Sequence, residues 1–402
     1  MIRTLVVGQA NRDIFNGLAT SLGGRNLPLE VRFVENVQLI RHAISEYRPH
    51  VILSFMPEGK KSAMQNFPRS IRLRWVNYPF GFTTKEHAIG AILSMYTSVI
   101  TGENKSHEKL VSIITPTYNT GSVLLRTYDS ICGQSYREWE WVIYDDSTDE
   151  ETTQIVRLLA KDDSRISVMR GGEHSGFIGE VKRRAFRAAE GDVLVELDHD
   201  DELTEDCLQL IVDGFDEYPE CGFAYTECAE VNADGSPVKY GDTFAFGYGS
   251  YRPYPYMYRG KPYLVTNYPQ INQKTMRHIV GVPNHVRAWT KHAYEISGGH
   301  NPDLFVCDDY ELILRTYLTT RMLHIRHLGY IQHRVEGNSN THITRNAEIQ
   351  RQVAIFSNAY SSKIDLRAKE ILGDLYVDGA NQQLNLEYSV KEIQPRKTGT
   401  NG

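Results

Sequence analysis

"LVELDHDDELTEDCL", residues 194–208, contains the pattern that decides the fold: an apolar strand that ends abruptly in acidic side chains. Asp198, Asp200, Asp201 and Glu202 follow the strand almost without interruption. Carboxylates this close repel one another, and some of them stay protonated unless a positive charge lies among them. The stretch therefore predicts either a bound cation or a solvated turn that caps the next helix.

The cation interpretation rests on spacing and ligand chemistry. Asp198 and Asp200 are two residues apart at a strand end, so both can point to one side. Carboxylate oxygens suit Mg²⁺ or Mn²⁺, and a metal held by only two of them keeps positions for substrate phosphate. In the alternative, Asp200 or Asp201 caps a helix that begins near Glu202 or Thr204. The stretch by itself leaves both interpretations open.

Upstream of these acids, strand-like and helix-like segments alternate. Strands are expected at 110–119, at the start of 139–152 and at 165–172, and helices run to about Cys132 and over 178–192. This alternation predicts an α/β fold with a mostly parallel sheet flanked by helices. Ligands bind such sheets at the carboxyl ends of the strands, where this sequence places its polar residues.

Asp145 and Asp146 end the second of these strands and are candidate nucleobase-binding acids. A carboxylate can accept the imide N–H of uracil or thymine, or the paired N–H groups of guanine. Thr117 and Tyr118 on the neighbouring turn could cover the base, and Lys182 could reach base or phosphate. The competing interpretations are an Asx-turn for the acids and a solvated helix face for the lysine.

Residues 1–104 predict a separate, small Rossmann-like α/β unit of unclear role. Strands are expected at 4–8, 31–36 and 50–55, with helices over 11–22 and 37–48. Neither a glycine-rich dinucleotide motif nor a phosphate-binding loop follows a strand, so docking or scaffolding is the favoured role. A polar linker at 101–109 is expected to separate this unit from the rest.

The C-terminal half carries further candidates. Tyrosine and proline alternate over 244–269, which predicts a long aromatic loop, either an acceptor surface that uses Tyr254 and Tyr256 or a packing interface. A loop enters a helix at 298–318 and brings two acids with it, Asp308 and Asp309. The remaining expectations are a mobile lid at 336–340, a helix over 344–372 within a C-terminal helical segment at 336–393, and a disordered tail at 394–402.

The totals bound the function. The chain has 402 residues and a net charge of −6, which argues against general nucleic-acid binding. A secretory signal and a membrane-spanning stretch are not expected, and five scattered cysteines without a C-x-x-C pair favour a reducing, cytoplasmic location. Peripheral contact with the inner face of a membrane, through the basic segment 69–75, and homo-oligomer formation stay open.

Four stretches in this order resemble glycosyltransferase family 2 over about residues 108–335: "SIITPTYN", "WVIYDDSTD", "KRRAFRAAEGDVLVELDHDDEL" and "GGHNPDLFVCDDYELILR". The resemblance implies a GT-A fold with a mixed, mostly parallel sheet. It also implies an inverting, metal-dependent transferase of the hexosyltransferase type, with Mn²⁺ or Mg²⁺ as cofactor. The donor would be a nucleotide-diphosphate sugar, with uridine favoured by the acid-to-imide contact. The acceptor would be a glycan, a lipid-linked glycan or a protein.

The resemblance also implies roles for individual residues. Asp198 and Asp200 match the family's D-x-D motif, with His333 as a candidate third metal ligand, and Asp309 matches the general base. The donor-binding positions are carried over onto Pro116, Thr117, Tyr118, Asp145, Asp146, Lys182 and Asp198. Asp308 and His285, like the two tyrosines above, are candidates for the acceptor side.

Two departures from the family pattern bear on these roles. A glycine that the family has after its paired acids is missing between Asp146 and Ser147, which leaves open which acid meets the base. The family's "ARN" is "VKR" at 181–183. No processive-synthase "QxxRW" occurs, which favours a single addition. The alternatives are a sugar nucleotidyltransferase, although 115–122 lacks the basic glycine-rich loop it would need, and a non-catalytic scaffold that binds sugar nucleotides.

Overall fold

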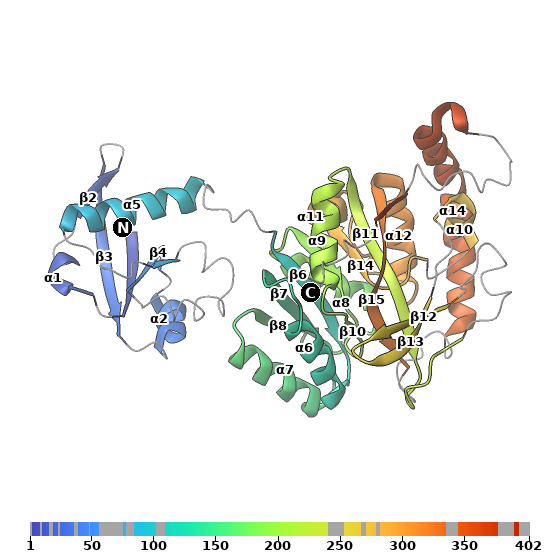
Figure 1. Cartoon of the computed structure of the whole chain (residues 1–402), viewed down its shortest axis with the longest axis horizontal. Helices are drawn as coiled ribbons and strands as arrows, with labels where there is room; N and C mark the ends of the chain where they lie inside the picture. Colours follow the sequence, from blue (N-terminus) through green and yellow to red (C-terminus); the bar gives the residue numbers. More distant parts are fainter. Residues whose placement is uncertain are drawn as a thin grey trace, which may run out of the picture. The chain divides into compact units, whose positions relative to one another are not determined.

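A computed structural model of the chain describes most of its residues (Figure 1). The described ranges are 2–8, 10–15, 19–22, 25–35, 39–47, 49–55, 75–77, 84–101, 109–239, 253–266, 271–278, 282–334, 345–376 and 390–393. They divide into two compact units: the first comprises Met1–Glu108 and Asp163–Arg165, and the second comprises Lys109–Asp162 and Ile166–Gly402.

The first unit is a β-sheet with helices packed on both of its faces. Its strands and helices are β1 (Ile2–Gly8), α1 (Arg12–Phe15), β2 (Ala19–Leu22), β3 (Arg25–Val34), α2 (Ile40–Tyr47), β4 (Val51–Phe55), β5 (Trp75–Asn77) and α5 (Lys85–Thr101). The strand order is β2-β3-β1-β4-β5, parallel except for the β2–β3 pairing. Side chains alternate along β1, so Ile2 and Val6 pack toward α1 and α5 while Leu5 and Val7 pack toward α2.

One expectation for this unit is wrong. Among the described residues of 11–22, Arg12–Phe15 form the short helix α1, but Ala19–Leu22 form strand β2 instead of continuing a helix. β2 pairs antiparallel with β3 over residues 25–28, and this pairing outweighs the local helical spacing.

The second unit contains the candidate site. Its elements up to the acidic stretch are β6 (Val111–Thr117), α6 (Leu124–Cys132), β7 (Trp139–Asp145), α7 (Glu150–Asp162), β8 (Ile166–Arg170), α8 (Ile178–Ala188) and β9 (Val193–Glu196). They are followed by β10 (Glu202–Leu203), α9 (Cys207–Glu217), β11 (Cys221–Val231), β12 (Tyr254–Tyr258), β13 (Lys261–Thr266), α10 (Gln273–His278), β14 (Arg287–Thr290), α11 (Lys291–Ile296), α12 (Asp308–Thr319), β15 (Arg321–His333), α14 (Asn346–Leu372) and β16 (Val390–Ile393).

These strands form one mixed sheet with helices around it (Figure 1). The central order is β10-β15-β11-β14-β9-β6-β7-β8. Among the described strands of this sheet, β10, β13 and β14 run opposite to all the others, so the sheet is mostly parallel, as the sequence predicted. Strands β6, β7 and β9 are parallel neighbours, so the residues that follow them meet at one edge.

The structure decides against the helix-cap interpretation of the acidic stretch. Glu202 and Leu203 form strand β10, and helix α9 begins only at Cys207, after Asp206. Asp200 and Asp201 therefore cap no helix. Their chain turns back into the sheet, because Glu202 and Leu203 pair with Ile331 and Tyr330 of β15.

The aromatic segment is also different from the expected loop. Residues Tyr254–Tyr258 and Lys261–Thr266 form an antiparallel hairpin, joined at Arg259 and Gly260, both of which have positive φ. Tyrosine favours strands, and Pro255 lies in β12, the outer strand of the hairpin, where a missing N–H is tolerated. The other residues of 244–269 up to 252 and after 266 lie outside the described ranges.

Toward the C-terminus, α14 confirms the long helix expected over 344–372. Strand β16 pairs in parallel with β15 and was not foreseen by the sequence. The expected lid at 336–340 and tail at 394–402 lie outside the described residues. Within the described part, every helix is too short or too polar to cross a membrane.

Candidate functional site

The acidic edge after β9 is built around one deeply buried carboxylate. Asp201 is 1% exposed and accepts hydrogen bonds from the Tyr330 hydroxyl (2.8 Å) and from the backbone N–H of His333 (2.7 Å). Tyr330 also accepts the Asp198 backbone N–H at 3.2 Å. Asp201 thus anchors the turn to β15, while Asp198 and Asp200 lie before it.

The edge is short of positive charge. Burial raises the pKa of Asp201 well above its usual range, and the charges of Asp200 and Asp198 raise it further. Burial also raises the pKa of Asp200. His199 lowers this pKa, and the negative charge of Asp198 raises it. Asp198 differs: burial would raise its pKa, but His285 Nε2, 3.2 Å from Asp198 Oδ2, and Lys182 lower it.

The donor set at this edge fits a hard divalent cation. Two aspartates with partly exposed side chains, 31% for Asp198 and 11% for Asp200, offer oxygen ligands where added positive charge would relieve the crowding. His333 Nε2 lies 2.7 Å from Glu202 Oε1, so it would have to leave that partner to become a ligand. In the part of the chain that is described, no group of three His, Cys, Asp or Glu side chains is arranged to hold a metal.

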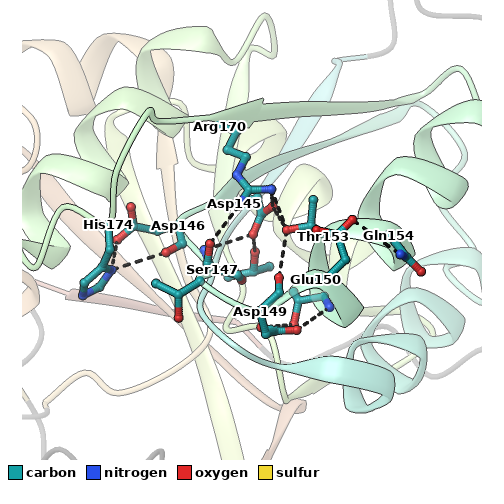
Figure 2. A network of polar contacts seen from close by, with 12 residues as sticks. Asp145, Asp146, Ser147, Asp149, Glu150, Thr153, Gln154, Arg170 and His174 are labelled. Atoms are coloured by element: carbon teal, nitrogen blue, oxygen red, sulfur yellow. Dashed lines mark hydrogen bonds and ion pairs between the residues drawn. The ribbon is translucent and has the colours of Figure 1, made fainter.

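The two acids at the end of β7 are both satisfied from within the chain (Figure 2). Asp145, 1% exposed, accepts from the Ser147 N–H (3.1 Å) and the Thr153 hydroxyl (3.0 Å), and Arg170 Nη1 lies 3.7 Å from it. Asp146 accepts the Ser175 N–H, and its Oδ2 lies 2.8 Å from His174 Nδ1. Ser147, Thr153 and Arg170 therefore surround the Asp145 carboxylate. The partners of Asp146, His174 and Ser175, lie in the segment at 171–176.

The expected donor turn is mostly strand. Pro116 and Thr117 are the last residues of β6 and are buried, with Thr117 donating to Asp145 at 3.4 Å. Tyr118 is 43% exposed and stacks on His174, with ring centroids 4.4 Å apart. Both rings are partly exposed and His174 also contacts Asp146, so a planar base could stack on this pair next to Asp146.

A buried ion network crosses the middle of the site. Lys182 on α8 contacts Glu196 of β9 (2.5 Å) and Asp308 of α12 (3.1 Å). Arg287 of β14 contacts Glu196 (3.1 Å) and Asp309 (2.9 Å). Lys182 is therefore held by two carboxylates and only 7% exposed, rather than extended toward the donor.

The expected base lies at the exposed rim of this network. Asp309 is in the first turn of α12, which begins after Cys307 with a left-handed backbone (φ 58°), and its side chain is 28% exposed. Burial would raise the pKa of Asp309, but Arg287 and Lys182 outweigh burial and lower it. Asp309 thus stays ionised and can accept a proton. Burial raises the pKa of Asp308 to about 6 despite Lys182.

One short segment joins the predicted metal ligands to the predicted base. His285 contacts Asp198, and Arg287, two residues later, contacts Asp309. The acceptor-side tyrosines lie elsewhere in the sheet: Tyr254 donates to Glu227, and Tyr256 packs edge-on against His327. Both tyrosines therefore anchor the hairpin.

Glu196 and Tyr330 were missed by the sequence analysis. A glutamate inside the apolar run "LVEL" was a visible signal, because a charge at a strand position predicted to be buried needs a partner. Tyr330 gave no such signal, since a tyrosine in a strand is ordinary.

Comparison with known proteins gives one family. Residues 112–276 match the model of Glycosyl transferase family 2. TuaG of Bacillus subtilis, named as a teichuronic acid biosynthesis glycosyltransferase, is 33% identical over 129 residues, which are 32% of this chain and 50% of TuaG. WfgD of Escherichia coli, named as a UDP-Glc:alpha-D-GlcNAc-diphosphoundecaprenol beta-1,3-glucosyltransferase, is 33% identical over 92 residues, 23% of this chain and 35% of WfgD. The chain thus spans half or less of the length of these relatives.

Among solved structures, TarS of S. aureus in complex with UDP-GlcNAc aligns with a TM-score of 0.47. The alignment is 19% identical and covers 65% of this chain and 71% of that one.

Proposed function

We propose that the chain moves one sugar from a nucleotide-diphosphate sugar to an acceptor hydroxyl, with inversion, because residues 112–276 match the model of Glycosyl transferase family 2. The observation that carries the proposal is the link between the two halves of the site. Asp198 and Asp309 are 111 positions apart, yet His285 and Arg287 of one segment contact them. This link supports the proposal that the metal and the base act in one site.

The proposed reaction is a single displacement. The acceptor oxygen forms a bond to the anomeric carbon while the bond from that carbon to the diphosphate oxygen breaks. The hydroxyl proton passes to Asp309, and the electron pair of the broken bond leaves with the nucleoside diphosphate. Arg287 holds Asp309 in place, and general base catalysis of this kind contributes about 10²–10⁴-fold.

Asp198 and Asp200 would hold the divalent metal, with diphosphate oxygens filling further positions, and the metal would supply charge neutralisation at the leaving group. His333 would join them only after releasing Glu202. Lys182 keeps Asp308 and Glu196 in place instead of extending toward the donor.

For the donor, we favour a uridine diphosphate sugar. Asp146 is the better candidate to accept the imide N–H, because Asp145 is enclosed by Ser147 and Thr153. The Tyr118–His174 stack beside Asp146 would cover the base. The name of WfgD adds support, since it contains a UDP-sugar donor and a lipid-diphosphate-linked sugar acceptor. We accordingly propose a lipid-linked glycan acceptor in polysaccharide biosynthesis.

A thermal-shift screen tests the donor site. UDP, GDP, dTDP and the matching triphosphates are compared with and without Mn²⁺. We expect UDP with Mn²⁺ to stabilise most, because a ligand that binds only the folded state raises the melting temperature. Stabilisation by triphosphates alone would favour the nucleotidyltransferase alternative.

Product formation tests the reaction itself. Radiolabelled UDP-sugars are incubated with undecaprenyl-diphosphate-linked acceptors, and sugar transfer is measured. Nucleotide binding without transfer to any acceptor tried would favour the non-catalytic scaffold.

A further inference from the structure

Glu196 is a fully buried carboxylate with two cationic partners. It ends β9, is 0% exposed, and offers Oε1 to Lys182 and Oε2 to Arg287. Neighbouring positions of the strand, Val193 to Val195, are apolar and equally buried. A charge at such a position is costly unless it is paired and hydrogen-bonded, and Glu196 is paired with Lys182 and Arg287.

Strand pairing fixes the geometry of this group. β14 runs antiparallel to β9, and Arg287 is the direct cross-strand partner of Glu196, so their side chains lie on the same face. Lys182 reaches the same carboxylate from α8. Three elements, α8, β9 and β14, therefore meet at the Glu196 carboxylate. Helix α12 joins them because Asp308 contacts Lys182 and Asp309 contacts Arg287.

Stability does not account for this arrangement. Replacing a buried ion pair or triad by apolar side chains is often neutral or even stabilising, because the desolvation of the charges offsets their attraction. Here three carboxylates, Glu196, Asp308 and Asp309, surround two cations, so the balance of charge is unfavourable as well. The arrangement does fix the orientation of the Arg287 guanidinium, because its Nη1 contacts Glu196 and its Nη2 contacts Asp309.

We infer that Glu196 is a positioning residue that aims the Asp309 carboxylate at the acceptor, acting through Arg287. This inference rests on the proposed role of Asp309 as the base. Glu196 touches neither donor nor acceptor, and its effect is confined to the step in which the acceptor loses its proton.

The charges around Asp309 agree with this role. Arg287 from β14 and Lys182 from α8 lower the pKa of Asp309, while Glu196 from β9 raises it and so limits the loss of basicity. Asp308 is the adjacent carboxylate on α12 itself. His300, from the loop before α12, adds no positive charge near neutral pH, because burial and then Lys182 lower its pKa to about 3.

The test is a double-mutant cycle on the full-length chain. Glu196→Gln, which keeps the shape and removes the charge, is expected to lower kcat about 10- to 100-fold, as misplacement of a reacting group does. The Kd for UDP with Mn²⁺ should stay within about twofold. In the Asp309→Asn background, Glu196→Gln should cause no further loss of the residual rate, because the group that it positions is already gone.

Glu311→Gln is the matched control. Glu311 is also buried and lies on α12, but it binds Arg315 and Tyr360 instead of Arg287. We expect this control to lower the melting temperature without changing kcat by more than about twofold.

Two results would overturn the inference. One is the same fractional loss of rate from Glu196→Gln in both backgrounds, and the other is weakened UDP binding by Glu196→Gln. If Glu196→Gln does not fold, Arg287→Lys replaces it in the cycle, since an ammonium cannot bridge two carboxylates in a fixed fork. Failure of the proposed function is distinguishable, because the wild-type chain would then transfer no sugar at all.

Discussion

Asp309 combines two properties that a proton acceptor needs. Its carboxylate is ionised because Arg287 and Lys182 lower its pKa, and its side chain is still partly exposed at the rim of the site. Asp308, the next residue back, is buried against Lys182 and has the opposite shift. Adjacent aspartates thus differ in role because α12 turns one outward and one inward.

The role of Asp309 predicts a separation of binding from chemistry. Asp309→Asn should reduce transfer by about 10²–10⁴-fold, because the amide cannot accept the acceptor proton. Binding of UDP with Mn²⁺, measured by calorimetry, should change less than twofold. Normal turnover by this variant would show that another group is the base.

The buried Asp308 predicts a pH-dependent stability. Its pKa of about 6 in the folded chain exceeds the value near 3.9 of an unfolded aspartate, so the folded state binds more protons between these pH values. The contribution to stability is complete below about pH 4 and is lost as pH rises through 6. The amide of the Asp308→Asn variant does not titrate in this pH range, so the variant lacks this pH-dependent loss of stability.

The stability of Asp308→Asn relative to wild type should therefore rise by up to about 3 kcal/mol from pH 4 to pH 7. Urea unfolding of both proteins at several pH values measures this. A difference that stays constant with pH would mean that the Lys182 ion pair dominates.

At the scale of elements, the start of α8 is locked to the loop before α12. Gly179 donates its N–H to the Leu304 carbonyl at 3.0 Å, and a Cβ on Gly179 would come within 2.0 Å of the Asn301 carbonyl oxygen. This close backbone approach holds Lys182 and Asp308 within reach of each other, since each follows its side of the contact by a few residues.

Gly179→Ala should therefore destabilise the chain by about 1–3 kcal/mol, because neither backbone can yield without moving α8 or the loop. The matched control is Gly172→Ala, where an added Cβ meets nothing within 4 Å and the change should stay within about 0.5 kcal/mol. Urea midpoints of the two variants provide the comparison. Equal midpoints would show that the loop adjusts freely.

Elements were predicted well where one local signal dominated. Strands β6, β7 and β9 are buried in the parallel part of the sheet, so apolar residues dominate their sequence and identify them as strands. The hairpin β12–β13 was missed because its prolines suggested a loop, and the pairing that allows them cannot be read from the segment itself. The same holds for β2, whose strand exists only because β3 lies beside it.

At the scale of the whole chain, the hydrophobic cores are separate. The large core of the second unit contains residues between Val111 and Ile364. The first unit has two cores, one made of residues between Ile2 and Ile92 and the other of residues between Leu5 and Trp75. Each unit thus encloses its own apolar side chains, which is the condition for independent folding.

We therefore predict that a fragment of residues 109–402 folds by itself and binds UDP with Mn²⁺ as the full chain does. Calorimetric scans should show one transition for the fragment and an additional one for the full chain. A fragment that is unfolded or has lost nucleotide binding would show that the first unit contributes to the site.

Part of the candidate site was predictable because its acidic residues give a strong local signal. Acids at strand ends and at the start of a helix stand out in the sequence, so Asp145, Asp198 and Asp309 could be selected from it. Their partners could not, because Arg287 reaches Glu196 only through the pairing of two strands 91 residues apart. Which acid would be enclosed and which would face the donor depended on such partners too.

The burial of Glu196 and Arg287 has a consequence for ionic strength. Added salt weakens attraction between groups in water but hardly affects charges that ions cannot approach. We therefore expect high salt to weaken binding of the anionic donor and so to lower kcat/KM. The value of kcat at saturating substrate should change little. Plots of kcat and kcat/KM against sodium chloride would then diverge.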